Sequence, residues 1–142
     1  MNKIKVIITK KNIDYTDVYN IYYKVGWIKK TEKFNEKSVE NIIKKSYCFA
    51  CAIDKKKIIG IGRAISDGTS DAYIQDVAVL ENYRKKGIGK QIIVKLIDHL
   101  KKKKIGWIGL ITEPGSSEFY KKLGFKKMDK HIPMIYNFNR EL

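Results

Sequence analysis

The clearest helical pattern in the sequence lies between residues 88 and 100. Apolar side chains recur there at the 3.6-residue period of an amphipathic helix, at Ile88, Ile92, Ile93, Leu96, Ile97 and Leu100. A run rich in Val, Ile and Tyr at residues 73–80 precedes this helix, and a second apolar run follows it at residues 107–112. Because a helix with one apolar stripe must bury that stripe, the pattern predicts a helix that packs on a sheet.

The rest of the chain predicts further strands and helices. Expected strands cover residues 4–9, 47–53, 58–66 and 132–138. Expected helices cover residues 14–25 and 36–45, and Ser116 or Ser117 can cap a further short helix that stops at Gly124. The turn at residues 54–57 predicts an antiparallel hairpin. The order β-α-α-β-β-β-α-β-α-β predicts a single domain over residues 1–142, of class α/β or α+β, with one mixed, largely antiparallel sheet flanked by helices.

Length and hydropathy limit the class of protein. The chain has 142 residues, of which 44% are hydrophobic, as expected for one ordinary globular domain. No apolar run approaches the roughly 18 to 20 residues of a membrane span. The apolar stretch near the N-terminus is too short for the core of a signal peptide. We therefore expect a cytoplasmic protein that does not span a membrane.

The charge balance is strongly basic. Lys and Arg total 30 against 15 Asp and Glu, which gives a formal charge of +15. Such a charge attracts polyanions and phosphorylated ligands. The arginines are Arg63, Arg84 and Arg140, and all other basic residues are lysines spread along the chain. Because base readout in nucleic acids depends mainly on arginine, we interpret most of the charge as solvated surface and do not expect a nucleic-acid partner.

Cys48 and Cys51 have the CxxC spacing that elsewhere marks a redox pair or half of a zinc site. They lie within a strand-like run, where a separation of three residues places the two thiols on opposite faces. The sequence has no second CxxC, and His99 and His131 stand alone. We therefore expect both cysteines to pack in the core, and no metal site.

A basic loop with two glycines lies between the run at 73–80 and the helix at 88–100. Glycine lets backbone N–H groups approach a phosphate, the helix N-terminus favours negative charge, and lysines add positive charge. A P-loop is excluded because Gln91, not Ser or Thr, follows Lys90, and the dinucleotide fingerprint is excluded because Ile92 stands where a third glycine is needed. The loop thus predicts a site for a pyrophosphate.

Two segments together resemble the GNAT family of acetyl-CoA-dependent N-acetyltransferases. They are the Arg-x-x-Gly-x-Gly loop that follows the strand Ile-Gln-Asp-Val-Ala-Val at residues 74–79, and Phe-Tyr-Lys-Lys-Leu-Gly-Phe at residues 119–125. The resemblance implies two central parallel strands that splay apart to admit CoA. It implies that Val77, Ala78 and Val79 bind the pantetheine arm, the amides of Val77 and Val79 also polarising the acetyl carbonyl. It assigns the pyrophosphate to Arg84, Lys85, Lys86, Gly87, Ile88, Gly89 and Lys90.

The resemblance also implies catalytic roles. Tyr120 corresponds to the family's general acid, which protonates the departing thiolate and so also contacts the cofactor. The general base is left open between Asp76 and Glu113. Strand alternation puts Asp76 on the face opposite Val77 unless a bulge redirects the strand. Many relatives carry an asparagine before the last helix, and this chain has none at residues 113–117.

The acceptor amine is expected between the first helices and the strand ends. The residues expected near it are Trp27, Ile28, Phe34, Arg63 and Asp67. The predicted function is transfer of an acetyl group from acetyl-CoA to a primary amine of a small molecule by direct attack in a ternary complex. Two alternatives stay open: a protein acetyltransferase acting on lysine or an N-terminal amine, and a non-catalytic basic module that binds CoA or nucleic acid. The oligomeric state is also open, a homodimer included.

Overall fold

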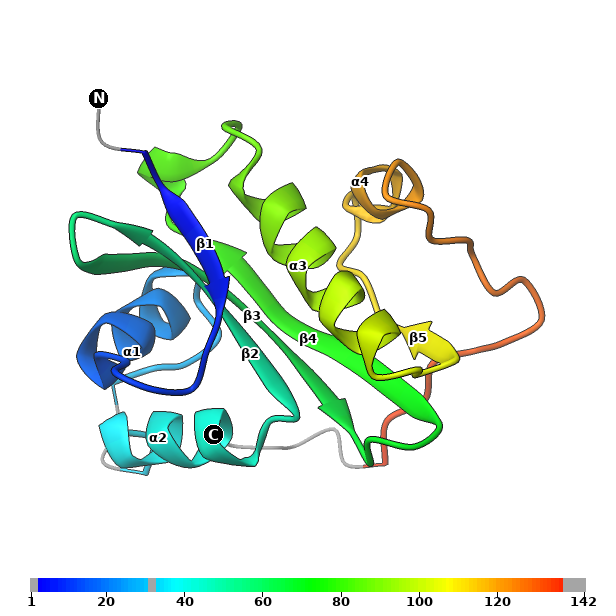
Figure 1. The fold of residues 1–142 in the computed structure, drawn as a ribbon, viewed down its shortest axis with the longest axis horizontal. Helices are drawn as coiled ribbons and strands as arrows, with labels where there is room; N and C mark the ends of the chain where they lie inside the picture. Colours follow the sequence, from blue (N-terminus) through cyan, green and yellow to red (C-terminus); the bar gives the residue numbers. More distant parts are fainter. Residues whose placement is uncertain (1–2, 31–32, 137–142) are drawn as a thin grey trace.

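A five-stranded sheet forms the centre of the molecule (Figure 1). The computed structural model describes residues 3–30 and 33–136. The strands follow one another in chain order: β1 (Lys5–Ile8), β2 (Cys48–Asp54), β3 (Lys57–Ser66), β4 (Asp71–Val79) and β5 (Trp107–Gly109). Neighbours from β1 to β4 are antiparallel, whereas β4 and β5 are parallel. The mixed, largely antiparallel sheet predicted from the sequence is therefore confirmed.

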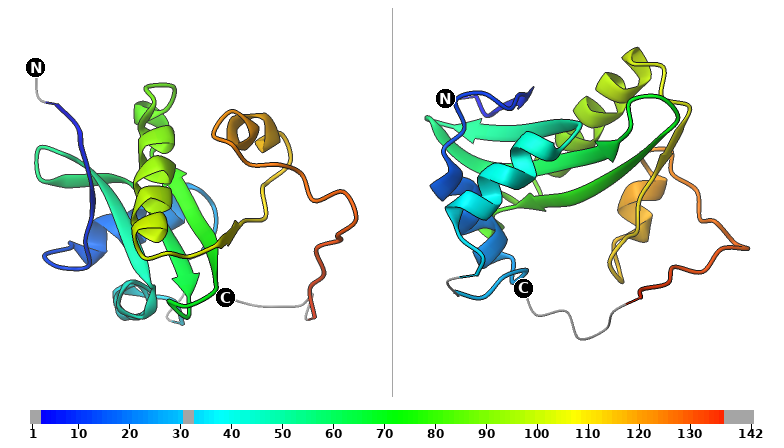
Figure 2. Two further views of the ribbon diagram at one scale, coloured as in Figure 1. Left: turned by 45° about the vertical axis from the view of Figure 1, so that its right-hand side comes forward. Right: turned by 90° about the horizontal axis from the view of Figure 1, so that it is seen from below.

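Helices cover both faces of this sheet, as Figure 2 shows. On one face α3 (Ile88–Lys102) packs through the apolar residues that the sequence pattern indicated. On the other face lie α1 (Tyr15–Lys24) and α2 (Glu36–Lys45). A short 3-10 helix, η1 (Glu81–Tyr83), precedes α3, and α4 (Ser117–Lys121) follows β5. Cys48 packs with α3 and Cys51 with α1 and α2, so the prediction that their thiols occupy opposite faces is confirmed.

Local sequence explains where the first two helices begin. The Asp14 carboxylate accepts hydrogen bonds from the backbone N–H groups of Thr16 and Asp17, and the Asn35 side chain accepts from those of Lys37 and Ser38. These side chains satisfy amides that have no partner inside the helix. The cap of α3 is different, because Gly87 has no side chain with which to satisfy the amides that follow it.

The close packing of α3 on the sheet depends on a glycine of β3. A β-carbon at Gly62 would lie only 2.6 Å from Ile92 Cγ2 and 3.1 Å from Leu96 Cδ1. The helix therefore approaches the strand more closely than any side chain at position 62 would permit. This contact fixes the height of α3 above the sheet, and with it the position of the basic loop at the start of the helix.

The C-terminal strand predicted over residues 132–138 is wrong for the part that the structure describes. Residues 132–136 form no strand, and Met134 and Tyr136 are almost entirely exposed. Pro133 lacks the N–H that a strand ladder needs. Residues 137 and 138 lie outside the described residues. The strand expected at 107–112 is also shorter, since β5 ends at Gly109.

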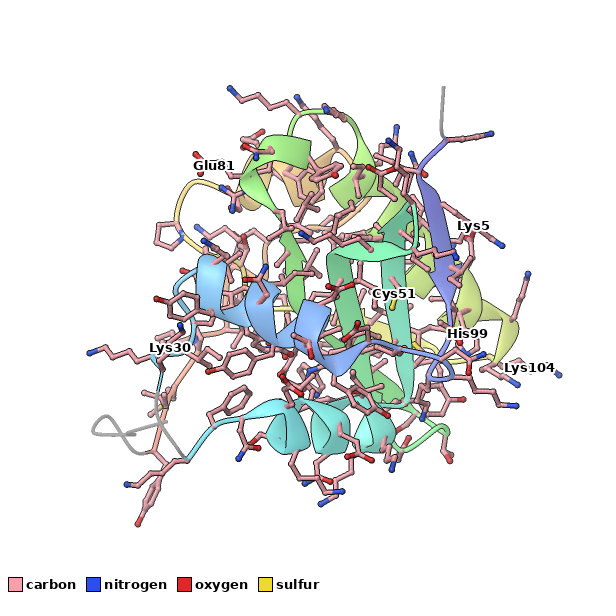
Figure 3. The ribbon with its side chains drawn as sticks, turned by 90° about the vertical axis from the view of Figure 1, so that its left-hand side faces the viewer. Lys5, Lys30, Cys51, Glu81, His99 and Lys104 are labelled. Atoms are coloured by element: carbon pink, nitrogen blue, oxygen red, sulfur yellow. The ribbon has the colours of Figure 1, made fainter. Side chains whose placement is uncertain are left out.

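Within residues 3–30 and 33–136, no helix combines the length and apolar character needed to cross a membrane. The same residues contain no group of three or more His, Cys, Asp or Glu side chains that could hold a metal ion. Figure 3 shows lysine side chains such as those of Lys5, Lys30 and Lys104 extending away from the body of the protein, while Cys51 lies within the sheet.

Candidate active site

The parallel strands β4 and β5 separate soon after they meet (Figure 2). They pair only at Asp71 with Trp107, Ala72 with Ile108 and Tyr73 with Gly109, after which β4 continues to Val79 and the chain beyond β5 diverges. The splay expected from the resemblance is therefore present. A cleft of about 420 Å³ lies beside the open part of β4, lined by Trp27, Tyr73, Ile74, Gln75, Asp76, Val77, Leu110, Ile111, Thr112, Glu113, Ser116 and Tyr120.

The open edge of β4 presents backbone donors. Leu80 N donates a 2.9 Å hydrogen bond to Ile59 O, so at this position the backbone faces β3. Since successive residues of a strand turn their N–H groups to alternate edges, the amides of Val77 and Val79 face the side from which β5 has departed. These are the two amides that the resemblance assigned to the pantetheine arm and the acetyl carbonyl.

A bulge interrupts β4 at the centre of the cleft. Between the pairs Gln75 with Arg63 and Ala78 with Ile61, β4 contains one more residue than β3. The backbone of Asp76 accommodates the additional residue. Its φ is +53°, a left-handed conformation that costs an L-residue about 1 kcal/mol. The bulge that would redirect Asp76 is therefore present.

The Asp76 carboxylate is held from two sides. Its Oδ2 atom accepts hydrogen bonds from the Tyr22 hydroxyl and from Arg63 Nε, each 2.6 Å long. Burial, together with the negative charge of Asp76, raises the pKa of Tyr22 far above its ordinary value. Tyr22 therefore stays a neutral hydrogen-bond donor at any physiological pH.

The basic loop forms the N-terminus of α3. Gly87 caps the helix with a φ of +78°, which glycine adopts without strain, and the first backbone bond runs from Gln91 N to Gly87 O. The N–H groups of residues 88–90 thus have no partner within the helix. Arg84, Lys85, Lys86 and Lys90 are exposed around them, and Ile88 contributes its amide while its side chain is buried in the core. The donors and charges fit the pyrophosphate of CoA.

Arg84 links the loop to the open edge of β4. Its Nε atom donates a 3.0 Å hydrogen bond to Val79 O. The N–H and C=O of one strand residue face the same edge, so Arg84 lies on the side of β4 that faces the splay. The loop and the free amides therefore form one continuous surface.

Tyr120 lies across the cleft on α4. Its ring contacts Phe119 and Phe125 edge to face, at centroid distances of 5.0 and 5.7 Å. Burial raises the pKa of its hydroxyl, so the group keeps its proton at neutral pH. A β-carbon at Gly89 would lie 3.6 Å from Phe119 Cζ, which shows how near α4 comes to the start of α3.

The two candidate bases differ in their surroundings. Both line the cleft. Asp76 is engaged by Tyr22 and Arg63. Glu113 is exposed, and within the described part of the chain its carboxylate forms no ion pair and no hydrogen bond. Geometry alone thus leaves Glu113 the freer of the two carboxylates.

Of the residues expected near the acceptor, one lines the cleft, and two more contact the Tyr22–Asp76 pair beside it. Trp27 lines the cleft and meets the Tyr22 ring edge on at 5.6 Å. Ile28 is buried in the core beneath α1, and Phe34 packs against Tyr19 and Tyr22. Arg63 does not line the cleft itself but binds Asp76, which does.

Asp67, the last of the expected residues, lies outside the cleft. It lies in the turn between β3 and β4, where its carboxylate accepts from the backbone N–H groups of Thr69 and Ser70. These bonds lower the pKa of Asp67. Asp67 is not among the residues that line the cleft.

Sequence reasoning missed several residues that line or support the cleft. Tyr73, Gln75, Thr112 and Ser116 line it, and Tyr22 supports it through Asp76. The signal for Tyr73 and Gln75 was their alternation with Ile74 on a strand already identified. No local feature of the sequence indicated the role of Tyr22. Its spacing along the helix predicts a core residue but does not predict a partner for its hydroxyl.

Comparison with known proteins shows which family this chain is similar to. A protein-family model described as an acetyltransferase (GNAT) domain matches residues 27–133. The chain is 36% identical over 123 residues to the protein named Uncharacterized N-acetyltransferase ycf52 of Pyropia yezoensis, covering 84% of this chain and 68% of that protein. It is 33% identical over 126 residues to the protein named Histone acetyltransferase TAP1 of Glycine max, covering 81% of this chain and 53% of that protein.

The fold matches a solved structure over nearly its whole length. A GNAT-family acetyltransferase from Streptococcus pneumoniae TIGR4 superposes with a TM-score of 0.79 and 25% sequence identity, covering 97% of this chain and all of the other. The similarity thus extends over nearly the whole fold.

Proposed function

This chain belongs to the GNAT family of acetyltransferases, and we propose that it transfers an acetyl group from acetyl-CoA to the primary amine of a small molecule. The observation that carries the proposal is the continuity of the open β4 edge with the N-terminus of α3. One surface offers the amides of Val77 and Val79, and the adjoining surface offers unpaired helix amides among lysines. The first suits an amide-containing arm and the second suits a pyrophosphate.

Acetyl-CoA, when bound, supplies the acetyl group as a thioester. The N–H of Val77 or Val79 donates a hydrogen bond to the acetyl carbonyl and stabilises the charge that grows on its oxygen during attack. One such preorganised donor contributes about 3 to 4 kcal/mol to the transition state. The amine attacks the carbonyl carbon directly, so the protein needs no nucleophile of its own.

Two protons must move during this reaction. The Tyr120 hydroxyl donates its proton to the departing sulfur, a role for which its raised pKa keeps it protonated. The attacking amine loses a proton to a carboxylate at the cleft, directly or through a water molecule. Glu113 is the favoured acceptor of that proton because Asp76 already binds two donors on one oxygen.

The size of the cleft supports a small acceptor. Its volume of about 420 Å³ is in the range of small-molecule sites. Trp27 and Tyr73 supply aromatic walls, and Asp76 and Glu113 supply negative charge for an ammonium group. The acceptor approaches over these residues, opposite the loop at the start of α3.

A protein acceptor, through lysine or an N-terminal amine, is the second candidate. The name of the Glycine max relative supports it. A cytoplasmic location stays a prediction, and the oligomeric state stays open.

The test is thiol release from acetyl-CoA in the presence of single amines and of lysine-containing peptides. Release with small primary amines, and its absence with N-terminally blocked peptides of matched charge, is the expected result. Thiol release with peptides and not with small amines would favour a protein acceptor over a small molecule. No release with any amine, although acetyl-CoA binds, would overturn the proposed activity.

A further inference from the structure

One carboxylate oxygen on β4 receives two hydrogen bonds from two different elements. Asp76 Oδ2 accepts from Tyr22 of α1 and from Arg63 of β3, each at 2.6 Å. Both donors are shielded from solvent: Tyr22 is 4% exposed, and the Arg63 side chain is 15% exposed. Arg63 is itself oriented by Gln75 and Ser46, at 3.4 and 3.5 Å.

The residue held in this way is the one whose backbone departs from strand geometry. Asp76 has a φ of +53°, and β4 gains a residue relative to β3 at this point. A non-glycine residue keeps such a conformation only where its surroundings hold it there. The two hydrogen bonds, made by rigid elements on either side, are the contacts that hold it.

The peptide that follows Asp76 carries the N–H of Val77. A rotation of the Asp76 backbone toward ordinary strand geometry would remove the bulge and turn that N–H away from the cleft, because a shift of one residue exchanges the two edges of a strand. The direction of the Val77 donor therefore depends on the conformation of Asp76.

We propose that Tyr22 and Arg63 are positioning residues that hold the bulge at Asp76 and thereby aim the Val77 N–H at the acetyl carbonyl. The inference rests on the proposed function, because it concerns how the same cleft stabilises the developing oxyanion. It assigns Asp76 a structural place in the mechanism and leaves proton removal to Glu113.

The first variant is Tyr22→Phe, which removes one donor and keeps the ring that packs against Trp27 and Phe34. Its matched control is Tyr19→Phe on the same helix, whose hydroxyl has no hydrogen-bond partner in the described part of the chain. The second variant is Arg63→Lys, which keeps the positive charge and loses the Nε donor. Asp76→Asn and Asp76→Ala form a second pair, since asparagine tolerates a left-handed φ and retains an acceptor oxygen.

Two measurements are made on each variant: steady-state kinetics, and the dissociation constants of acetyl-CoA and of CoA by titration calorimetry. We expect Tyr22→Phe to lower kcat about 10-fold, a part of the roughly 100- to 1000-fold effect of losing an oxyanion donor. The affinity for acetyl-CoA should fall, while the affinity for CoA changes less than about 2-fold, because only acetyl-CoA carries the carbonyl. Asp76→Asn should retain more activity than Asp76→Ala, and Tyr19→Phe should match the wild type.

Three outcomes overturn the inference without touching the proposed function. One is a wild-type kcat in Tyr22→Phe, and another is an equal loss of affinity for acetyl-CoA and CoA, which a merely loosened fold would produce. The third is equal inactivity of Asp76→Asn and Asp76→Ala with normal binding of acetyl-CoA, which would identify Asp76 as the base and leave the proposed function intact. Failure of the wild type to bind acetyl-CoA would overturn the proposed function and this inference together.

Discussion

The Tyr83 hydroxyl donates a 2.9 Å hydrogen bond to Asp54 Oδ2 and so ties the end of η1 to the hairpin between β2 and β3. Tyr83 immediately precedes the basic loop, and the Lys86 ammonium lies 5.5 Å from the centre of its ring. The bond thus anchors the start of the loop to a part of the sheet that is distant in sequence.

Replacing Tyr83 by Phe removes this anchor and preserves the ring beneath Lys86. We expect the dissociation constant of CoA to rise about 3- to 10-fold, the effect of losing one ordinary hydrogen bond, because the freed loop must be ordered on binding. Titration calorimetry measures the change. An unaltered dissociation constant would show that the loop needs no anchor. In either case kcat at saturating acetyl-CoA should stay at the wild-type value.

Gly87→Asp tests the anion site at the start of α3. A β-carbon there meets no atom within 4 Å, and aspartate is tolerated both at a left-handed φ and as a helix cap, so the fold should survive. Its carboxylate would bind the helix amides and repel phosphate, and binding of CoA should be abolished. Gly87→Asn is the matched control, with the same shape and no charge, and should lose far less affinity. Equal binding by Asp and Asn variants would place the pyrophosphate elsewhere.

Tyr120→Phe tests the general acid. Removing the proton donor should lower kcat by about 100-fold while the KM for acetyl-CoA changes little. The rate profile of the wild type should also fall at high pH, above the ordinary pKa of tyrosine, because burial raises the pKa of Tyr120. Tyr120→Phe should lack that descending limb. A variant with the wild-type rate would remove Tyr120 from the mechanism.

Gly62→Ala tests the contact that sets α3 on the sheet. The added methyl group would lie 2.6 Å from Ile92 Cγ2, so the helix must shift or the side chain must leave its rotamer. Overpacking of this kind costs about 1 to 3 kcal/mol, which urea denaturation resolves. Gly106→Ala is the control, because a β-carbon at Gly106 has no neighbour within 4 Å. Equal stability of the two variants would mean that α3 is free to move on the sheet.

The buried thiols give a prediction for pH. Burial raises the pKa of Cys48 to about 11 and that of Cys51 to about 12. Both thiols should react slowly with dithionitrobenzoate in the native protein and rapidly in urea. Since the unfolded thiols ionise near pH 8.5 and the folded ones do not, their contribution to stability is complete below that pH and is lost as the pH rises toward 11 and 12. Rapid reaction in the native state would show that the sheet opens locally.

Much of the fold follows from local patterns. The apolar period of residues 88–100 and the turn before Lys57 correctly indicated α3 and the hairpin of β2 and β3. The early end of β5 at Gly109 and the absence of a strand at residues 132–136 did not follow, because a strand continues only where a neighbour pairs with it. Whether a neighbouring strand is present depends on how the whole sheet assembles. The local preference of residues such as Ile132 and Tyr136 for a strand is the same whether that neighbour is present or not.

The candidate site could be predicted in part. The basic loop was evident because glycines and lysines at a helix start have a local meaning, and Tyr120 was identified through the resemblance. The role of Asp76 was not evident, since alternation along β4 says nothing of the additional residue opposite β3. Tyr22 and Arg63 come from other elements, and their meeting at one oxygen is a property of the tertiary structure.

The most direct test of the acetyl-CoA site is the thermal unfolding midpoint of the wild-type protein with and without acetyl-CoA. A ligand that binds only the folded state stabilises it by about 2.7 kcal/mol at 100 times its dissociation constant. The midpoint should rise with acetyl-CoA concentration, and this rise should be lost in Gly87→Asp. A wild-type midpoint that stays constant up to millimolar acetyl-CoA would contradict an acetyl-CoA site in this protein.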